Sequence, residues 1–184
     1  MRHIENPYQL NTVSYDDIRP VLRTGDLFFC CGKGFLSSTI KRITKSPFSH
    51  VGVIAVVGGR VLTIEAIKYG TAIRRFSRVL AGYKGDVVIA RSSATPEQLK
   101  TFWHEAVNFE GVKYGYWTAI RIWACVRFGI AMPKQGKAMI CSDLVARCFR
   151  EVGIAINANQ KHFTSPEDVW TSRAVSHCFG RVEL

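Results

Sequence analysis

The chain has 184 residues, 47% of them hydrophobic, and its 25 Lys and Arg against 14 Asp and Glu residues give a formal net charge of +11. This length and apolar content suffice for one buried core and argue against a disordered chain, so we expect a single domain over residues 1–184. The charge favours an anionic polymer or a membrane surface as partner, but the spread of the basic residues makes nucleic acid an unlikely ligand.

The N-terminal segment and the cysteines bear on location and cofactors. Met1 to Pro7 has no apolar stretch suited to a signal peptide, and no segment of about 18 apolar residues occurs elsewhere. We therefore expect a cytoplasmic protein, or one that is phage-borne or exported without a cleaved signal. The 6 cysteines contain no Cys-x-x-Cys pair, so we expect free thiols, no zinc site and no cofactor.

The first half of the chain is predicted to contain one helix and several strands. Leu36, Ile40 and Ile43 repeat at helical spacing, and the Gly58-Gly59 pair suits the positive φ of a tight hairpin turn. In chain order we predict a helical turn over Asp16 to Leu22, a strand over Leu27 to Cys31, a helix over Phe35 to Thr44 ended by Pro47, and hairpin strands over Val51 to Val57 and Arg60 to Ile67.

The second half is predicted to be mainly helical. Thr95 and Ser165 each precede a proline at a first helical position, which is typical of a capped helix start. Strands early and helices late, with antiparallel neighbours, predict an α+β domain. In chain order we predict a helix over Arg74 to Leu80, a strand over Asp86 to Arg91, helices over Pro96 to Phe109, Trp117 to Phe128, Ser142 to Val152 and Pro166 to Ser172, and a last strand over Val175 to Val182.

Cys141 is the candidate nucleophile because it stands where a helix is predicted to begin. The residues after it place Leu144, Val145 and Cys148 on one apolar helix face, so the thiol falls in the first turn. Free backbone N–H groups and the positive end of the helix dipole lower a thiol pKa there and can bind an oxyanion. Cys148 and Cys125 are interpreted as core residues, adjacent Cys30 and Cys31 as pointing to opposite faces of a strand, and Cys178 as lacking a base.

His50 is the candidate base, at the mouth of the apolar strand that begins the hairpin. Gly52 lies two positions on along the same face, which leaves space beside the ring. Glu65, in the partner strand, is the candidate group that orients the imidazole. A strand-end histidine that caps a loop and a solvent-facing Glu65 remain the alternatives. Weaker candidates for the orienting group are Asp86, Asn108 and Thr63.

Four short motifs resemble those of the circularly permuted NlpC-type (papain-like) cysteine hydrolases, especially the YiiX-like branch. They are S-H-V-G-V-I at 49–54, I-E-A-I at 64–67, I-C-S-D-L-V at 140–145 and S-P-E-D-V at 165–169. With the Thr24-Gly25-Asp26-Leu27 opening, the resemblance covers about residues 23–170. It implies a permuted papain-like fold in which a small antiparallel sheet or barrel packs against helices. In that family the histidine precedes the nucleophile, as it does here.

The resemblance also implies a function: Cys141 as nucleophile, His50 as base and Glu65 as orienting group of a thiol hydrolase or acyltransferase. The substrate would be a cell-wall peptide or an acylated lipid with an amide or ester bond. Asp143 and Ile140 depart from the family, in which glutamate and an aromatic residue are commoner, and Tyr114 resembles a tyrosine that lies before the nucleophile. The alternative is a binding or structural module of the same fold, without catalysis, within a larger assembly.

Overall fold

The computed structural model describes residues 9–67, 69–108, 111, 140–156 and 164–184. In these residues, seven strands form one sheet in the order β1-β7-β6-β2-β3-β4-β5. Neighbouring strands are antiparallel except β1 and β7, which are parallel. The strands are β1 (Thr12–Ser14), β2 (Leu27–Gly32), β3 (His50–Val57), β4 (Arg60–Ile67), β5 (Gly70–Arg75), β6 (Gly85–Ser92) and β7 (Val175–Glu183).

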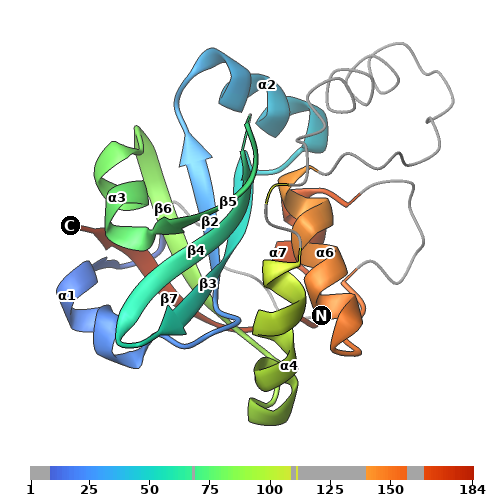
Figure 1. Cartoon of the computed structure of the whole chain (residues 1–184). Coiled ribbons are helices and arrows are strands. Elements are labelled where there is room, and N and C mark those ends of the chain that lie inside the picture. The colour runs from blue at the N-terminus through green and yellow to red at the C-terminus, as the bar shows by residue number, and fades with distance from the viewer. Residues whose placement is uncertain (1–8, 68, 109–110, 112–139, 157–163) are drawn as a thin grey trace, which may run out of the picture.

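Helices cover both faces of this sheet (Figure 1). One face packs against α4, α6 and α7 through a core that includes Phe29, Phe48 and Trp170. The other face packs against α1 and α3 through a core that includes Phe28 and Phe76. The described helices are α1 (Tyr15–Ile18), the 3-10 turn η2 (Arg19–Val21), α2 (Phe35–Thr44), α3 (Phe76–Gly82), α4 (Pro96–Val107), α6 (Cys141–Glu151) and α7 (Pro166–Trp170).

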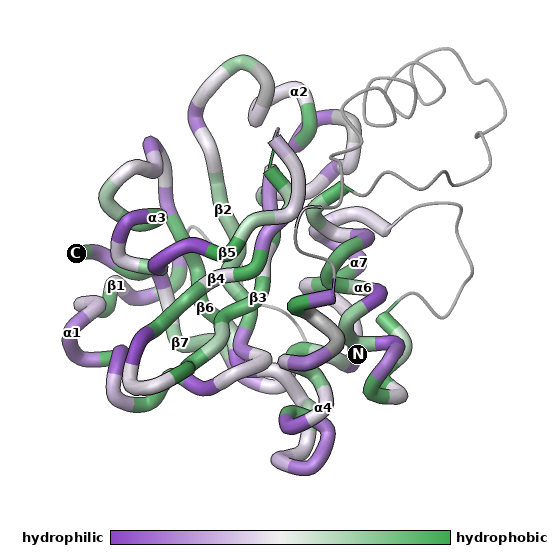
Figure 2. The backbone as a smooth tube through the Cα atoms, viewed as in Figure 1, coloured by the Kyte–Doolittle hydropathy of each residue, from purple (hydrophilic) through white to green (hydrophobic). Residues whose placement is uncertain are grey.

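Strand β2 lies at the centre of the sheet and is buried along its whole length. Its residues are mostly hydrophobic, as are those of the neighbouring strand β3 (Figure 2). Because side chains alternate along a strand, Cys31 joins the core under α6 and Cys30 joins the core under α3. The prediction that these two cysteines point to opposite faces is therefore confirmed.

Most predicted elements of the described chain are present, and the α+β class is confirmed. The helix over Phe35–Thr44 has the predicted bounds. Its C-cap residue Lys45, with a left-handed φ of 50°, ends it, so Pro47 is not what stops the helix. Gly58 and Gly59 make the hairpin turn with φ of 56° and 71°. The predicted helix over Trp117 to Phe128 and the predicted helix end at Phe109 lie outside the described residues.

The start of the predicted helix over Arg74 to Leu80 is wrong. Residues Gly70–Arg75 form the edge strand β5, and the helix begins only at Phe76. Antiparallel pairing with β4 takes precedence over the local pattern, with Arg74 opposite Thr63. The short strand β1, which pairs in parallel with the last strand, was not predicted.

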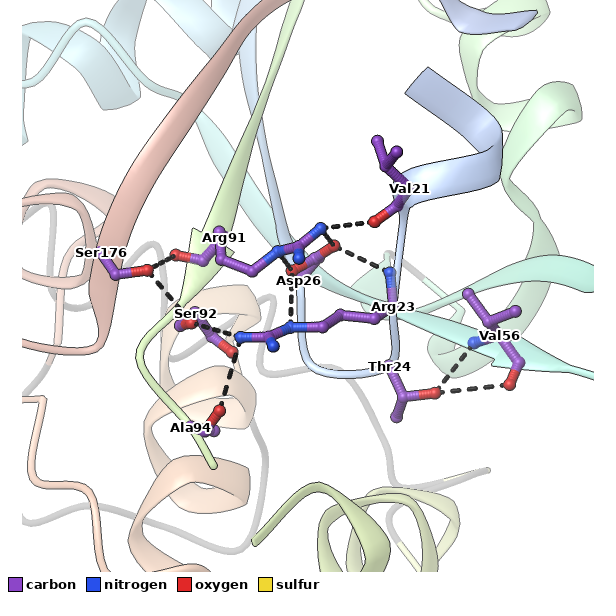
Figure 3. Close-up of polar contacts among 9 residues, drawn as sticks. All are labelled: Val21, Arg23, Thr24, Asp26, Val56, Arg91, Ser92, Ala94 and Ser176. Atoms are coloured by element: carbon purple, nitrogen blue, oxygen red, sulfur yellow. Dashed lines mark hydrogen bonds and ion pairs between the residues drawn. The ribbon is translucent and has the colours of Figure 1, made fainter. Parts of the chain in front are cut away.

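An ion-pair cluster joins the start of β2 to the end of β6 (Figure 3). The fully buried Asp26 carboxylate lies 2.9 Å from Arg91 Nε and accepts a hydrogen bond from the Arg23 backbone N–H at 2.9 Å. Arg23 in turn donates to the Ser92 carbonyl at 3.1 Å. Burial raises the pKa of Asp26 although both arginines act against that rise. Asp26 directly precedes β2, whereas His50 pairs with Cys30 near the far end of β2. The ion-pair cluster and His50 therefore lie at opposite ends of the sheet.

None of the described helices has the length and apolar character that a membrane span requires.

Candidate functional site

The three predicted site residues meet at one end of the sheet. His50 is the first residue of β3, Glu65 lies near the end of the antiparallel strand β4, and Cys141 is the first residue of α6, which packs against both strands. The ladder between β3 and β4 runs from Val53–Ile64 to Val57–Arg60. The beginning of β3 therefore lies beyond this ladder, where the first turn of α6 approaches it.

Glu65 is a buried carboxylate that contacts His50, so the solvent-facing alternative for Glu65 is wrong. Its side chain is only 2% exposed, and its Oε2 lies 3.0 Å from His50 Nε2. Its other oxygen, Oε1, accepts a hydrogen bond from Thr63 Oγ1 at 3.0 Å and from Arg74 Nε and Nη2 at 3.0 and 2.8 Å. Thr63, a weaker candidate for the orienting role, instead holds Glu65.

Arg74 is the site residue that the sequence did not reveal. The local sequence pattern places Arg74 in a helix, where it would not face Glu65. In β5, Arg74 pairs with Thr63, and Ala72, two residues earlier, pairs with Glu65. Arg74 and Glu65 are therefore diagonal neighbours on one face of the sheet. A strand pattern over Gly70–Arg75 would have been the signal that places Arg74 there.

The electrostatics of Cys141 and His50 favour a thiolate and an imidazolium. Burial raises the pKa of the Cys141 thiol, but the charge of His50, its hydrogen bond and the backbone N–H groups of Val51 and Ser142 outweigh burial and hold the pKa below its ordinary value. Burial lowers the pKa of His50, but its interactions with Cys141 and Glu65 outweigh burial and raise that pKa to about 10. Because Nε2 faces Glu65, Nδ1 is the nitrogen available to the thiol.

The first turn of α6 is tied to the segment before α7. The buried Ser142 hydroxyl donates to the Thr164 carbonyl, and the buried Asp143 carboxylate accepts the Thr164 backbone N–H at 3.3 Å. Asp143, where glutamate is commoner in the resembling family, thus fastens the helix start. Among the described residues no side chain caps α6 at Ile140, and the backbone N–H groups of Val51 and Ser142 interact with the Cys141 thiol.

The predicted space beside the imidazole is filled. A Cβ on Gly52 would meet the Phe28 ring at 2.5 Å and Glu65 Cβ at 3.1 Å. The Phe28 ring also lies 6.0 Å from the His50 ring, centroid to centroid. Because Gly52 has no side chain, Phe28 and Glu65 can approach β3 closely. The Phe28 ring then packs beside the His50 imidazole.

The remaining candidates take other places. Asp86 lies in β6 opposite Cys31, and Asn108 follows α4. Cys148 is fully buried in the core under α6, as predicted, and the five described cysteines lie outside any disulfide. Tyr114 and Cys125 lie outside the described residues.

Comparison with known proteins supplies a structural neighbour. No family model matches the sequence, and no curated protein matches it. The structure is similar to the crystal structure of the metalloprotein YiiX from Escherichia coli O157:H7, with a TM-score of 0.65 and 17% sequence identity. The match covers 84% of this chain and 94% of that chain. The resemblance to the YiiX-like branch is thereby confirmed for the fold: the chain has the α+β fold of YiiX.

Proposed function

We propose that the protein is a thiol hydrolase or acyltransferase that acts on an amide or ester bond, with Cys141 as nucleophile, His50 as acid and base, and Glu65 as the group that orients His50. One observation carries the proposal: His50 interacts both with the buried Glu65 carboxylate, through Nε2, and with the Cys141 thiol. A nucleophile, a base and an orienting group in this order are the arrangement that thiol catalysis requires.

In the first step the Cys141 thiolate attacks the substrate carbonyl carbon, and the carbonyl oxygen becomes an oxyanion. The backbone N–H groups at the start of α6 are donors that can stabilise that charge. The His50 imidazolium then gives its proton to the leaving amine or alcohol as the carbon–heteroatom bond breaks. The product of this step is an acyl-thioester on Cys141 and a neutral imidazole.

In the second step the neutral His50 removes a proton from water, or from an acceptor alcohol or amine, which attacks the thioester. The acyl group leaves on the new nucleophile, and the thiolate and the imidazolium form again. Glu65 keeps its negative charge throughout, because Arg74 and Thr63 hold its Oε1 while Oε2 faces the imidazole. Water as acceptor gives hydrolysis, and an alcohol or amine gives acyl transfer.

The fold and the chain order support a circularly permuted papain-like arrangement. His50 and Glu65 precede Cys141, so the strand that carries the base comes before the helix that carries the nucleophile. The substrates we propose are a cell-wall peptide or an acylated lipid. Anionic polymer or an anionic membrane surface remains the proposed environment of a chain with a net charge of +11.

YiiX is described as a metalloprotein, so metal binding needs a test at this site. Among the described residues, no group of three or more His, Cys, Asp and Glu side chains is placed to hold a metal ion. His50 Nε2 and both oxygens of Glu65 already have partners, and the Arg74 guanidinium beside the carboxylate repels a cation. The donors that the described residues offer at this site therefore do not fit a metal, and no step of the proposed reaction uses one.

Alkylation of the purified protein with iodoacetamide tests the proposal, with labelled peptides counted by mass spectrometry. At pH 6.5 we expect Cys141 to react at least ten times faster than the partly exposed Cys178, and His50→Ala to remove this advantage. Cys141→Ala should abolish hydrolysis of a panel of cell-wall peptides and acylated lipids. Equal reactivity of Cys141 and Cys178, with wild-type protein inert on the panel, would favour the non-catalytic module.

A further inference from the structure

We propose that Arg74, Arg75 and Arg78 form a binding site for an oxyanion, a phosphate or a carboxylate group, that the substrate of Cys141 carries. The site is a surface depression of about 500 Å³ lined by these three arginines and Ile73. The inference rests on the proposed function, because it assigns a charge to the substrate of that reaction.

The positive charge in the depression is not balanced by the described residues around it. Arg74 directs Nε and Nη2 to one carboxylate oxygen of Glu65, and that carboxylate is shared with His50. Arg75 and Arg78 are exposed, and neither makes a hydrogen bond or an ion pair with a described residue. Among the described residues, Glu65 is thus the one carboxylate that contacts any of the three guanidinium groups, and it contacts Arg74 alone. An oxyanion would relieve their mutual repulsion and accept the planar, paired hydrogen bonds that arginine provides.

Regular elements of the fold hold these arginines in place. Arg75 ends β5 opposite Leu62 of β4, and Arg78 lies in α3, which begins one residue later. The fully buried Phe76 ring anchors α3 in the core beneath the sheet. Guanidinium groups carried by a paired strand and an anchored helix lose less freedom on binding than groups on a loop.

The depression lies within reach of the thiol along the sheet. Ala72 pairs with Glu65, and Arg75 lies three residues farther along β5, which is about 10 Å at the usual rise of a strand. Glu65 contacts His50, and the register places His50 two residues beyond Glu65 in the direction away from Arg75, so a substrate that spans the site would carry its negative group roughly 15–20 Å from the scissile bond. Ile73, which packs partly on the core, offers an apolar contact to the part between them.

Two alkylating reagents of different charge test the site. Iodoacetate is negative and iodoacetamide neutral, so the ratio of their rates at Cys141 reports the local potential. We expect Arg75→Ala/Arg78→Ala to lower this ratio about two-fold at low salt, as two unit charges roughly 15–20 Å away would, with the iodoacetamide rate of each variant as the reference. The matched control, Lys100→Ala/Arg150→Ala, removes the same charge from α4 and α6 and should leave the ratio unchanged.

Direct binding separates this inference from the proposed reaction and identifies the oxyanion. In Cys141→Ala, which keeps the arginines, titration with glycerol 3-phosphate or N-acetylglutamate should shift arginine side-chain NMR signals, and Arg75→Ala/Arg78→Ala should remove the shifts. Shifts with one probe alone assign phosphate or carboxylate. No shift with either probe, or equal rate ratios in the two double variants, overturns the site. If the NMR shifts appear but Cys141 of the wild-type protein reacts with neither alkylating reagent, the oxyanion site stands and the proposed reaction is overturned.

Discussion

Arg74 places its Nη2 and Nε 2.8 and 3.0 Å from a single carboxylate oxygen of Glu65. The other oxygen lies 3.0 Å from His50 Nε2, and His50 in turn interacts with Cys141. Guanidinium, carboxylate, imidazolium and thiolate therefore alternate in charge along one line of contacts. Each oxygen of Glu65 has its own partners, so the carboxylate can neither rotate nor take a proton without losing contacts.

Arg74→Ala should slow the reaction more than it unfolds the protein. We expect kcat to fall about ten-fold, since Glu65 loses two charge-assisted hydrogen bonds and His50 its fixed orientation. The free energy of unfolding should fall by about 1–2 kcal/mol, because the Arg74 side chain is 42% exposed and water screens the pair. Arg74→Lys should restore part of kcat. Turnover and urea unfolding measure both effects, and Arg60→Ala is the exposed control.

If Arg74→Ala lowers the free energy of unfolding but leaves kcat normal, Arg74 stabilises the fold and does not position the site. A normal kcat with a normal free energy of unfolding would mean that the salt bridge is absent in solution.

Glu65→Gln should narrow the pH range of activity from its alkaline side. Glu65 and Cys141 raise the pKa of His50, so the imidazolium persists to high pH and is lost only as the pH rises through that raised value. Glutamine keeps the shape but removes the charge, so the His50 pKa falls and the alkaline limb moves to lower pH. We expect kcat to fall about 10–100-fold. A pH–rate profile of kcat/KM measures the shift.

Thr63→Val is the comparison for Glu65→Gln, because it removes one hydrogen bond to Glu65 Oε1 and leaves the carboxylate charge. We expect it to lower kcat only a few-fold and to leave the alkaline limb in place. Identical alkaline limbs in wild type and Glu65→Gln would contradict the assigned role of Glu65.

Asp26→Ala should destabilise the fold and leave the chemistry of the site intact. The change removes the acceptor of Arg91 and of the Arg23 backbone N–H while the guanidinium groups stay partly buried (Figure 3). We expect a loss of about 2–3 kcal/mol, below the usual cost of breaking a buried pair, because both arginines can reach water. Urea denaturation with the exposed Asp17→Asn as control measures it. An unchanged midpoint would show that the cluster contributes nothing.

The sequence predicted the elements whose signals are local. The hairpin has its Gly-Gly turn, α7 has a Ser165 capping box before Pro166, and β2 is a short apolar run, so each was predicted to within about two residues. The pair of His50 and Glu65 followed from that hairpin. Cys141 could be placed at a helix start because the apolar helix face begins directly after it.

The parts that the sequence did not reveal depend on contacts between distant segments. Residues Gly70–Arg75 form a strand because β4 offers them an edge, whereas their local pattern also permits the start of a helix. Arg74 could not be assigned to the site without that register. The space expected beside Gly52 is filled by Phe28 from β2, a neighbour that only the sheet order reveals.

Gly52→Ala should disturb both stability and activity, because the added methyl group has no room. Its Cβ would lie 2.5 Å from the Phe28 ring and 3.1 Å from Glu65 Cβ, so the ring or the strand that carries Glu65 must shift. We expect a loss of about 1–3 kcal/mol in the free energy of unfolding. A shift of Glu65 also lengthens its contact with His50, so kcat should fall along with stability. Gly82→Ala, with no atom within 4 Å of its added Cβ, is the control. Equal unfolding midpoints and turnover for the two variants would contradict the close packing of Phe28 and Glu65 around Gly52.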